Sequence, residues 1–396
     1  MKRPWTVILC GAAVVTLAMG VRQAFGLFLP QMSAALDISR GSFGLALALQ
    51  NLLFGLAQPV VGAIADKHGA GRVIFFGALL YIAGLVAAAM ATSAIGLHLS
   101  FGVAIGMALS ATTFVVVLGA VGRVVAPEQR SLSFGIITAG GSLGQFLVVP
   151  AGQMLLAELG YRLALIALAG LIALCCALAV GLAGKPVAVA QEQSSQRLSD
   201  ALGEASRHSG YLLLNAGFFV CGFHVAFIAT HFPAYLNDRG LGLQIGASAL
   251  ALIGLFNIFG SYVFGMAGDR FRMKWLLSAI YGLRAVIIAL FLLLPLTSTS
   301  ALVFAAAMGF LWLGTVPLTS GLVGRIFGMR YLSTLYGVVF LSHQIGSFFG
   351  AWAAGQVYDM FGSYDIAWTA SIILGVVAML LHLPIRDTPV ARLQPA

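Results

Sequence analysis

The chain has 396 residues, of which 60% are hydrophobic and only 8% are charged. An ordinary soluble domain carries about 25% charged residues, so this composition excludes a water-soluble protein or enzyme. The formal net charge is +9, but the Lys and Arg residues are spread singly through short segments and form no basic stripe. We therefore expect a lipid bilayer around the chain and no nucleic-acid partner.

Apolar runs of about 20 residues, the length that crosses a hydrocarbon core ~30 Å thick, recur from end to end. The first run follows Lys2 and Arg3 and continues past Gly20 to Leu29, which favours a retained spanning helix over a cleaved signal peptide. Charged and Gly/Pro/Ser-rich breaks delimit twelve predicted helices: 5–29, 43–65, 72–93, 95–121, 131–156, 162–183, 210–236, 245–267, 274–295, 301–323, 333–357 and 364–383.

One longer polar segment, 185–209, separates the first six predicted helices from the last six. It is rich in Ser, Gln, Glu and Arg, which predicts a solvated linker. The sequence thus predicts an all-α membrane protein with a six-helix bundle in 1–184, a cytoplasmic linker in 185–209 and a second six-helix bundle in 210–396. We expect it to act as a monomer.

The positions of the basic residues predict the orientation. With the N-terminus inside, sixteen of the 21 Lys and Arg residues fall in cytoplasmic segments, and only Arg40, Arg162 and Arg239 fall in outer loops. Cytoplasmic loops are enriched in Lys and Arg, so both termini are expected in the cytoplasm of a bacterial inner membrane protein. The remaining two, Arg22 and Arg284, lie inside predicted spans.

A loop is repeated in the two halves. Gly62 precedes Asp66 by four residues after the second helix, and Gly265 precedes Asp269 by four residues after the eighth. Glycines of the fifth and eleventh helices also correspond, with a slip of one residue. Duplication of a six-helix unit explains both matches.

The first of these loops, Gly62 to Arg72, resembles the Gly-x-x-x-Asp-[Arg/Lys]-x-Gly signature of the major facilitator superfamily. The stretches Gly20–Phe28, Ser142–Gln145 and Gly355–Tyr364 resemble, within it, the monocarboxylate transporter and oxalate/formate antiporter group. This resemblance implies the twelve-helix fold, alternating access between two halves, and a central cavity lined by helices 1 and 7.

The resemblance also implies site residues, with one departure. Mammalian relatives commonly have a Lys where Arg22 stands. They usually carry a carboxylate-binding Arg in helix 8, but Ser261 occupies that place here, and Asn257 stands where an Asp often precedes it. The helix-8 anion site therefore does not carry over, and the resemblance does not by itself imply lactate-type proton symport.

Cations within the spans point to an anionic substrate. Every Asp and Glu lies in a loop or at the end of a predicted span, so none lies near mid-membrane, where an Arg costs about 2.5–3.5 kcal/mol on insertion scales. Arg22 can hold a carboxylate through two parallel hydrogen bonds. The alternative is that it reaches lipid headgroups or pairs with Asp37 or Glu158. Arg284 is a second candidate, although a structural pairing with a group such as Asp269 fits a peripheral ninth helix equally well.

Histidine is the ordinary side chain that titrates near neutral pH, so any proton coupling falls to span histidines or to the substrate. His224 and His231 lie two turns apart on one face of helix 7; a hydrogen-bonded structural role is the alternative for each. Four polar span residues either line the path or tie helices together: Gln23, Gln145, Asn257 and Gln344. Four loop residues are candidates for a conformational latch: Asp66, Arg72, Asp269 and Arg270.

The leading hypothesis is a secondary transporter of a small, monocarboxylate-like organic anion, with H⁺ as a candidate coupling ion. The alternatives are a drug or hydrophobic-solute exporter, which usually carries an embedded acid, and a non-transporting solute sensor. Histidine-box clusters and a P-loop are absent from the sequence, and the cysteines Cys10, Cys175, Cys176 and Cys221 form no metal-binding spacing. No enzyme activity, metal or cofactor is therefore expected.

Overall fold

The computed structural model describes residues 4–122, 124, 130–183, 198–328 and 332–391, and all regular secondary structure within them is helical. Nine helical segments of this described part are long and apolar enough to cross a membrane. Helices suit a bilayer because their backbone N–H and C=O groups bond within the helix, where lipid offers no partner.

The residues before the predicted linker form ten helical elements. They are α1 (Pro4–Gln23), the 3₁₀ helix η1 (Phe25–Phe28), α2 (Leu29–Leu36), α3 (Arg40–His68), α4 (Ala70–Met90), α5 (Ala94–Leu97), the π-helix η2 (His98–Ala104), α6 (Ile105–Thr112), α7 (Phe114–Gly122) and α8 (Arg130–Leu182). The fifth and sixth predicted helices both lie in α8, which bends at Gly160, where φ is 71°. Glycine adopts this left-handed backbone without a Cβ clash.

The remaining elements begin with a short helix in the linker. They are α9 (Leu198–Arg207), α10 (Ser209–Asp238), α11 (Gly242–Arg270), α12 (Met273–Leu293), α13 (Ser298–Phe310), α14 (Thr315–Phe327), α15 (Leu332–Phe361) and α16 (Asp365–His382). Each of the twelve predicted ranges falls on helical elements. The breaks within the first, fourth and tenth ranges were not predicted.

The break in the first range has a packing reason. A Cβ added to Gly26 would collide with the carbonyl oxygen of Ala229, so glycine lets η1 approach the backbone of α10 closely. Pro30 then lies in the first turn of α2, where its missing N–H costs nothing. Within the predicted range 5–29, the regular α-helix therefore ends at Gln23, one residue after Arg22.

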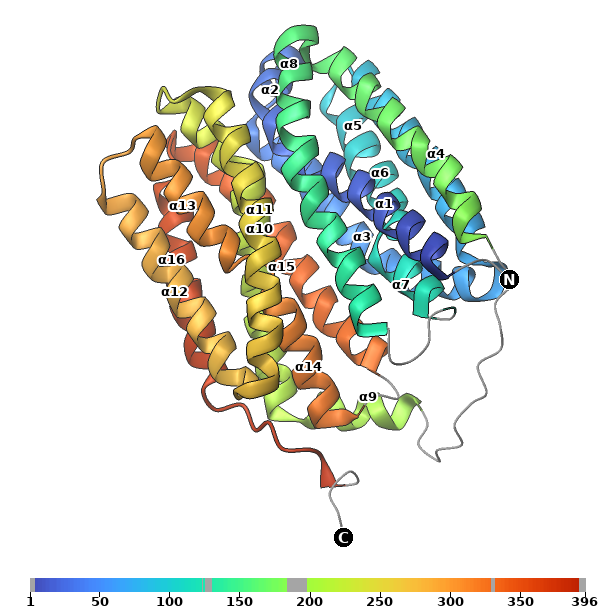
Figure 1. The fold of residues 1–396 in the computed structure, drawn as a ribbon. Helices are drawn as coiled ribbons and strands as arrows, with labels where there is room; N and C mark the ends of the chain where they lie inside the picture. Colours follow the sequence, from blue (N-terminus) through green and yellow to red (C-terminus); the bar gives the residue numbers. More distant parts are fainter. Residues whose placement is uncertain (1–3, 123, 125–129, 184–197, 329–331, 392–396) are drawn as a thin grey trace.

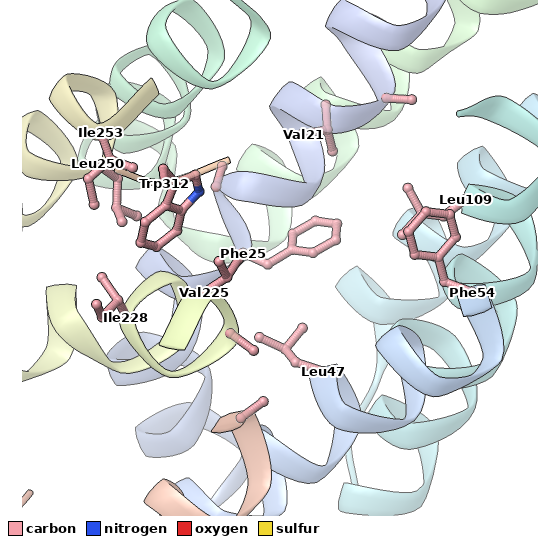
Figure 2. Close-up of a cluster of buried hydrophobic side chains, with 14 of the residues drawn as sticks. Val21, Phe25, Leu47, Phe54, Leu109, Val225, Ile228, Leu250, Ile253 and Trp312 are labelled. Atoms are coloured by element: carbon pink, nitrogen blue, oxygen red, sulfur yellow. The ribbon is translucent and has the colours of Figure 1, made fainter. Parts of the chain in front are cut away.

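Helices pack within each side of the linker and also across it. In the N-terminal part α8 packs against α1 and α4; in the C-terminal part α10 packs against α15 and α16 (Figure 1). The most extensive contacts between the parts are those of α3 with α15 and α8 with α11, and η1 and α2 also contact α10. Buried apolar side chains, including Val21, Phe25, Leu250 and Trp312, fill the space near these contacts (Figure 2). The domain limits 1–184 and 210–396 stay a prediction.

The two ends of the helix bundle differ. At the top of Figure 1 lie the bend of α8 and the helix α2, and at the bottom lie α9 and the C-terminal segment. The top is the end for which the basic residues predict an outer location. At the opposite end Arg272 donates to Asp387 from Nη2 (2.5 Å) and Nε (3.0 Å), which ties the segment after α16 to the start of α12.

Candidate functional site

The break after α1 places Arg22 beside α3. Its Nη2 donates a hydrogen bond to Asn51 Oδ1, and its Cζ lies 5.8 Å from the centroid of the Phe54 ring. Arg22 Nε is buried and has no hydrogen-bond partner among the described residues. Among the residues that the structure describes, no carboxylate forms an ion pair with Arg22. The charge of Arg22 is therefore neutralised by neither Asp37 nor Glu158.

Arg22 lines a small cavity of about 30 Å³ between the N-terminal and C-terminal parts. The walls come from four elements, α1, η1, α3 and α10: Arg22, Gln23, Phe25, Gly26, Leu47, Gln50, Asn51, Val225, Ala226, Ala229 and Thr230. Phe25, Leu47 and Val225 belong to its apolar wall, and their side chains are drawn in Figure 2. This volume holds on the order of one or two waters, so a solute enters only if the helices move apart.

A hydrogen-bond chain connects Arg22 to α15. Gln344 Nε2 donates to the backbone oxygen of Asn51 (3.0 Å), and Gln344 Oε1 lies 3.1 Å from His343 Nδ1. Close by, the rings of Phe54 and Phe340 meet edge to face with centroids 6.1 Å apart. Gln344 therefore belongs to a contact between the two parts beside Asn51, and it is not among the residues that line the cavity.

Gln23, Gln145 and Asn257 bridge α1, α8 and α11. Gln23 Nε2 donates to Gln145 Oε1 (3.2 Å), and Gln145 Nε2 donates to the backbone oxygen of Leu250 (2.8 Å). Asn257 Nδ2 donates to Ser142 Oγ (3.0 Å). Of these three, only Gln23 is among the residues that line the cavity.

Arg284 lies away from the cavity and is fully buried. Its Nη2 donates to the backbone oxygens of Leu311 (2.7 Å) and Trp312 (2.5 Å), where α13 ends, and its Nη1 lies 3.5 Å from Cys221 Sγ. A cation at a helix C-terminus is stabilised by the exposed carbonyl dipoles. This geometry supports a structural role for Arg284 at the break between α13 and α14. The side chain of Asp269 lies outside the described residues.

The two histidines of α10 have different partners. His224 Nε2 donates to the backbone oxygen of Ser371 in α16 (2.8 Å), and its Nδ1 has no partner among the described residues. His231 Nε2 donates to the backbone oxygen of Ala351 (2.6 Å), and its Nδ1 lies 3.1 Å from the Tyr364 hydroxyl. Both rings are fully buried, and neither lines the cavity.

Five polar residues meet at the predicted outer end; we call them the Arg40 cluster. They are Arg40, Asp238, Tyr358, Asp359 and Tyr364. Arg40 donates to both oxygens of Asp238 (2.6 and 2.8 Å) and to the Tyr364 hydroxyl (3.1 Å), and its Cζ lies 3.9 Å from the Tyr358 ring centroid. Asp359 accepts from the backbone N–H groups of Arg40 (3.0 Å) and Gly41 (2.7 Å) at the N-terminus of α3.

This cluster joins the start of α3 to the ends of α10 and α15, so it links the N-terminal and C-terminal parts. Burial is the largest single influence and disfavours the guanidinium charge, but the hydrogen bonds and charge interactions with Asp238 and Tyr364 together outweigh it and hold the pKa of Arg40 above its ordinary value. Arg40 therefore stays charged at any physiological pH.

The proposed latch falls largely outside the described residues. The side chains of Asp66 and Asp269 are not described, and neither are residues 329–331 before α15. Arg72 and Arg270 are exposed. The latch thus stays a prediction.

The sequence of residues 11–351 matches the family model of the Major Facilitator Superfamily. The chain belongs to this superfamily. It is 25% identical over 401 residues to "Monocarboxylate transporter 13" of Rattus norvegicus, covering 96% of this chain and 89% of that protein. It is 22% identical over 384 residues to the "Oxalate:formate antiporter" of Oxalobacter formigenes, covering 95% and 90%. The resemblance inferred from Gly20–Phe28 and the loop at Asp66 is confirmed.

Solved structures share the fold of this superfamily member. A bacterial homolog of the human lysosomal transporter Spinster, in an inward-facing and occupied conformation, has a TM-score of 0.76 at 16% identity, covering 96% of this chain and 97% of that one. A nucleoside transporter has a TM-score of 0.75 at 14% identity, covering 96% and 99%. The chain is a multi-pass membrane transporter and not an enzyme.

Sequence reasoning missed two parts of this transporter. Thr230 lines the cavity, but a threonine in an apolar helix carries no distinguishing signal. Arg40 was recognised only as an outer-loop cation. Nothing in the spacing of residues 40, 238 and 359 predicts that they meet, because the helices that carry them are far apart in the chain.

Proposed function

We propose that this protein is a secondary transporter of a small organic monoanion, monocarboxylate-like, which works by alternating access in the bacterial inner membrane with both termini in the cytoplasm. The observation that supports it most is Arg22. This cation lines a cavity between the two halves, keeps one buried N–H without a partner, and has no carboxylate in contact among the described residues.

The chemistry of the cavity favours a monoanion. A carboxylate can accept two parallel hydrogen bonds from a guanidinium, and Gln50, Asn51 and Thr230 supply further polar groups along the same wall. A single guanidinium neutralises one negative charge, so a second carboxylate would enter without a partner. The name of one relative, a monocarboxylate transporter, fits this class of solute, and an oxalate:formate antiporter handles one monocarboxylate, formate, and one dicarboxylate, oxalate.

Alternating access fits the way the cavity is closed. The Arg40 cluster joins the two halves at the predicted outer end, and the contact of Phe54 with Phe340 joins α3 to α15 beside the cavity. A solute can reach Arg22 only when one of these contacts separates. The Arg40 cluster is therefore the proposed outer gate.

The test combines binding and uptake. Thermal unfolding of the purified protein is measured against a panel of monocarboxylates and dicarboxylates, since a ligand that binds only the folded state raises the melting temperature. Arg22→Ala should remove the shift and the uptake, because a lost charge-assisted hydrogen bond costs about 1.5–3 kcal/mol, at least tenfold in affinity. Arg22→Lys should retain part of both.

Arg162→Ala is the matched control, because Arg162 is exposed and contacts only the adjacent Tyr161 among the described residues. It should bind and transport like the wild type. Normal uptake by Arg22→Ala in a folded, inserted protein would refute the proposed site.

A further inference from the structure

The titratable ring of His231 is hydrogen-bonded to Tyr364 of the Arg40 cluster. A carbonyl oxygen can only accept, so the bond of 2.6 Å to Ala351 places the ring hydrogen on Nε2. Nδ1 then accepts from the Tyr364 hydroxyl at 3.1 Å, and the oxygen of that hydroxyl accepts from Arg40 Nη1 at 3.1 Å. A directional chain thus runs from Arg40 through Tyr364 and His231 to Ala351.

This chain fits a neutral imidazole. If Nδ1 also carried a hydrogen, the Tyr364 oxygen would face two N–H donors, from Arg40 and His231. Its own hydrogen would lose its acceptor, because Arg40 and His231 are the hydrogen-bond partners of the hydroxyl within the described residues. A buried polar group left without a partner is unfavourable, so protonation of His231 opposes the closed arrangement.

The charges around His231 are nevertheless compatible with its protonation. Asp238 and Asp359 supply two negative charges against the single guanidinium of Arg40, so the cluster can take a second positive charge. The titratable and charged groups around His231 come from α3, α10, α15 and the start of α16: Arg40, Tyr235, Asp238, Arg239, Tyr358, Asp359, Tyr364 and Asp365.

From this geometry we propose that His231 is the binding site of a coupling proton and that its protonation favours opening of the Arg40 cluster. The proposal deepens the transport function and rests on it. A proton taken up from the outer side then accompanies opening of the outer gate, while Arg22 holds the anion. His224 lacks this role, because its donor bond goes to Ser371 and no hydrogen bond among the described residues links it to the Arg40 cluster.

The experiment measures the gate without any substrate. Spin labels are attached to Leu159→Cys and Ile366→Cys, two exposed positions at the predicted outer end of the two halves, after the four native cysteines are replaced. Distance distributions are recorded in lipid nanodiscs from neutral to acidic pH. The long-distance, open population should increase as the pH falls, by at most tenfold in the open-to-closed ratio per pH unit for one proton.

Two variants decide the assignment. His231→Gln should make the distance distribution independent of pH, and His224→Gln, seven residues earlier on the same helix, should leave the wild-type response unchanged. Should His231→Gln fail to fold, Tyr364→Phe provides the same test, because it removes the hydroxyl that links His231 to Arg40. A pH response that survives in His231→Gln or Tyr364→Phe, or its absence in the wild type, would overturn the proposal.

The proposed function is tested separately. Loss of anion binding in Arg22→Ala concerns the central cavity and leaves the distance measurement unaffected. A pH-independent gate combined with normal anion binding would reject the proton site alone. A pH-dependent gate combined with no anion binding would reject the substrate class alone.

Discussion

Arg22 Nη2 donates to Asn51 Oδ1, a neutral oxygen that directs the guanidinium without neutralising it. An amide carries no net charge, so the positive charge remains available to a ligand while one N–H is already held in place. This arrangement differs from that of Arg40, whose guanidinium is paired with the Asp238 carboxylate. Under the proposed function, Arg40 closes the outer end and Arg22 binds the anion.

Replacing that neutral oxygen by a carboxylate should inactivate the site. Asn51→Asp preserves the size of the side chain but supplies Arg22 with a permanent counter-ion, so a solute anion must compete with it. Anion affinity should fall at least tenfold in the thermal-shift assay. Asn215→Asp adds the same charge on α10, where Asn215 donates to the Tyr211 backbone, and should leave affinity unchanged. Equal affinity in the two variants would contradict the role of Arg22.

Breaking the Arg40 cluster should expose the cavity from the outside. Asp238→Asn removes the charge that accepts two hydrogen bonds from Arg40, which should cost about 1 kcal/mol and raise the open-to-closed ratio several-fold. The measurement is the rate at which an impermeant thiol reagent labels Val225→Cys in a protein without its native cysteines. Asp365→Asn breaks a longer, exposed pair with Arg239 (3.9 Å) and should change the rate little. Similar rates for both would exclude the cluster as the gate.

Arg284→Gln should destabilise the protein without weakening the anion site. It removes the two hydrogen bonds to Leu311 and Trp312, and each buried carbonyl left without a donor costs about 1–3 kcal/mol. The melting temperature should fall clearly, while the ligand-induced shift of the folded protein persists. The opposite pattern, a stable protein that no longer binds, would move the anion site to Arg284.

The contact of Asp387 with Arg272 predicts an acid-sensitive contribution to stability. The hydrogen bond from Arg272 holds the pKa of Asp387 below its ordinary value, so the folded state binds this proton less readily than the unfolded state. The contribution is complete above the ordinary carboxyl pKa and is lost as the pH falls through the depressed one. Asp387→Asn should lower the melting temperature at neutral pH, and its difference from the wild type should shrink in acid. A constant difference would show that the ionised pair is not the cause.

The sequence by itself determined where helices lie and that Arg22 is a cation inside a span without a nearby carboxylate in the chain. The hydrocarbon core offers no hydrogen-bond partner to the backbone. An apolar run long enough to cross it therefore forms a helix, in which its N–H and C=O groups bond to one another. That constraint is local, so the apolar runs and the breaks between them were enough to place each of the twelve ranges on helical elements. The isolation of Arg22 was also visible, because a span without any carboxylate can be recognised from the residues in order.

Only the tertiary structure decided how these helices break and which polar groups meet. The break after Gln23 depends on Gly26 approaching the backbone of Ala229, a contact that no local pattern contains. Arg40 finds Asp238 at a separation of 198 residues and Asp359 at 319. In the sequence, Arg284 is a candidate anion contact and His231 a candidate for proton coupling; in the structure Arg284 donates to carbonyls at the end of α13, and His231 contacts Tyr364 of the Arg40 cluster. The rotation and packing of whole helices determine these hydrogen-bond partners, because a side chain can bond only to groups on the helices packed against its own.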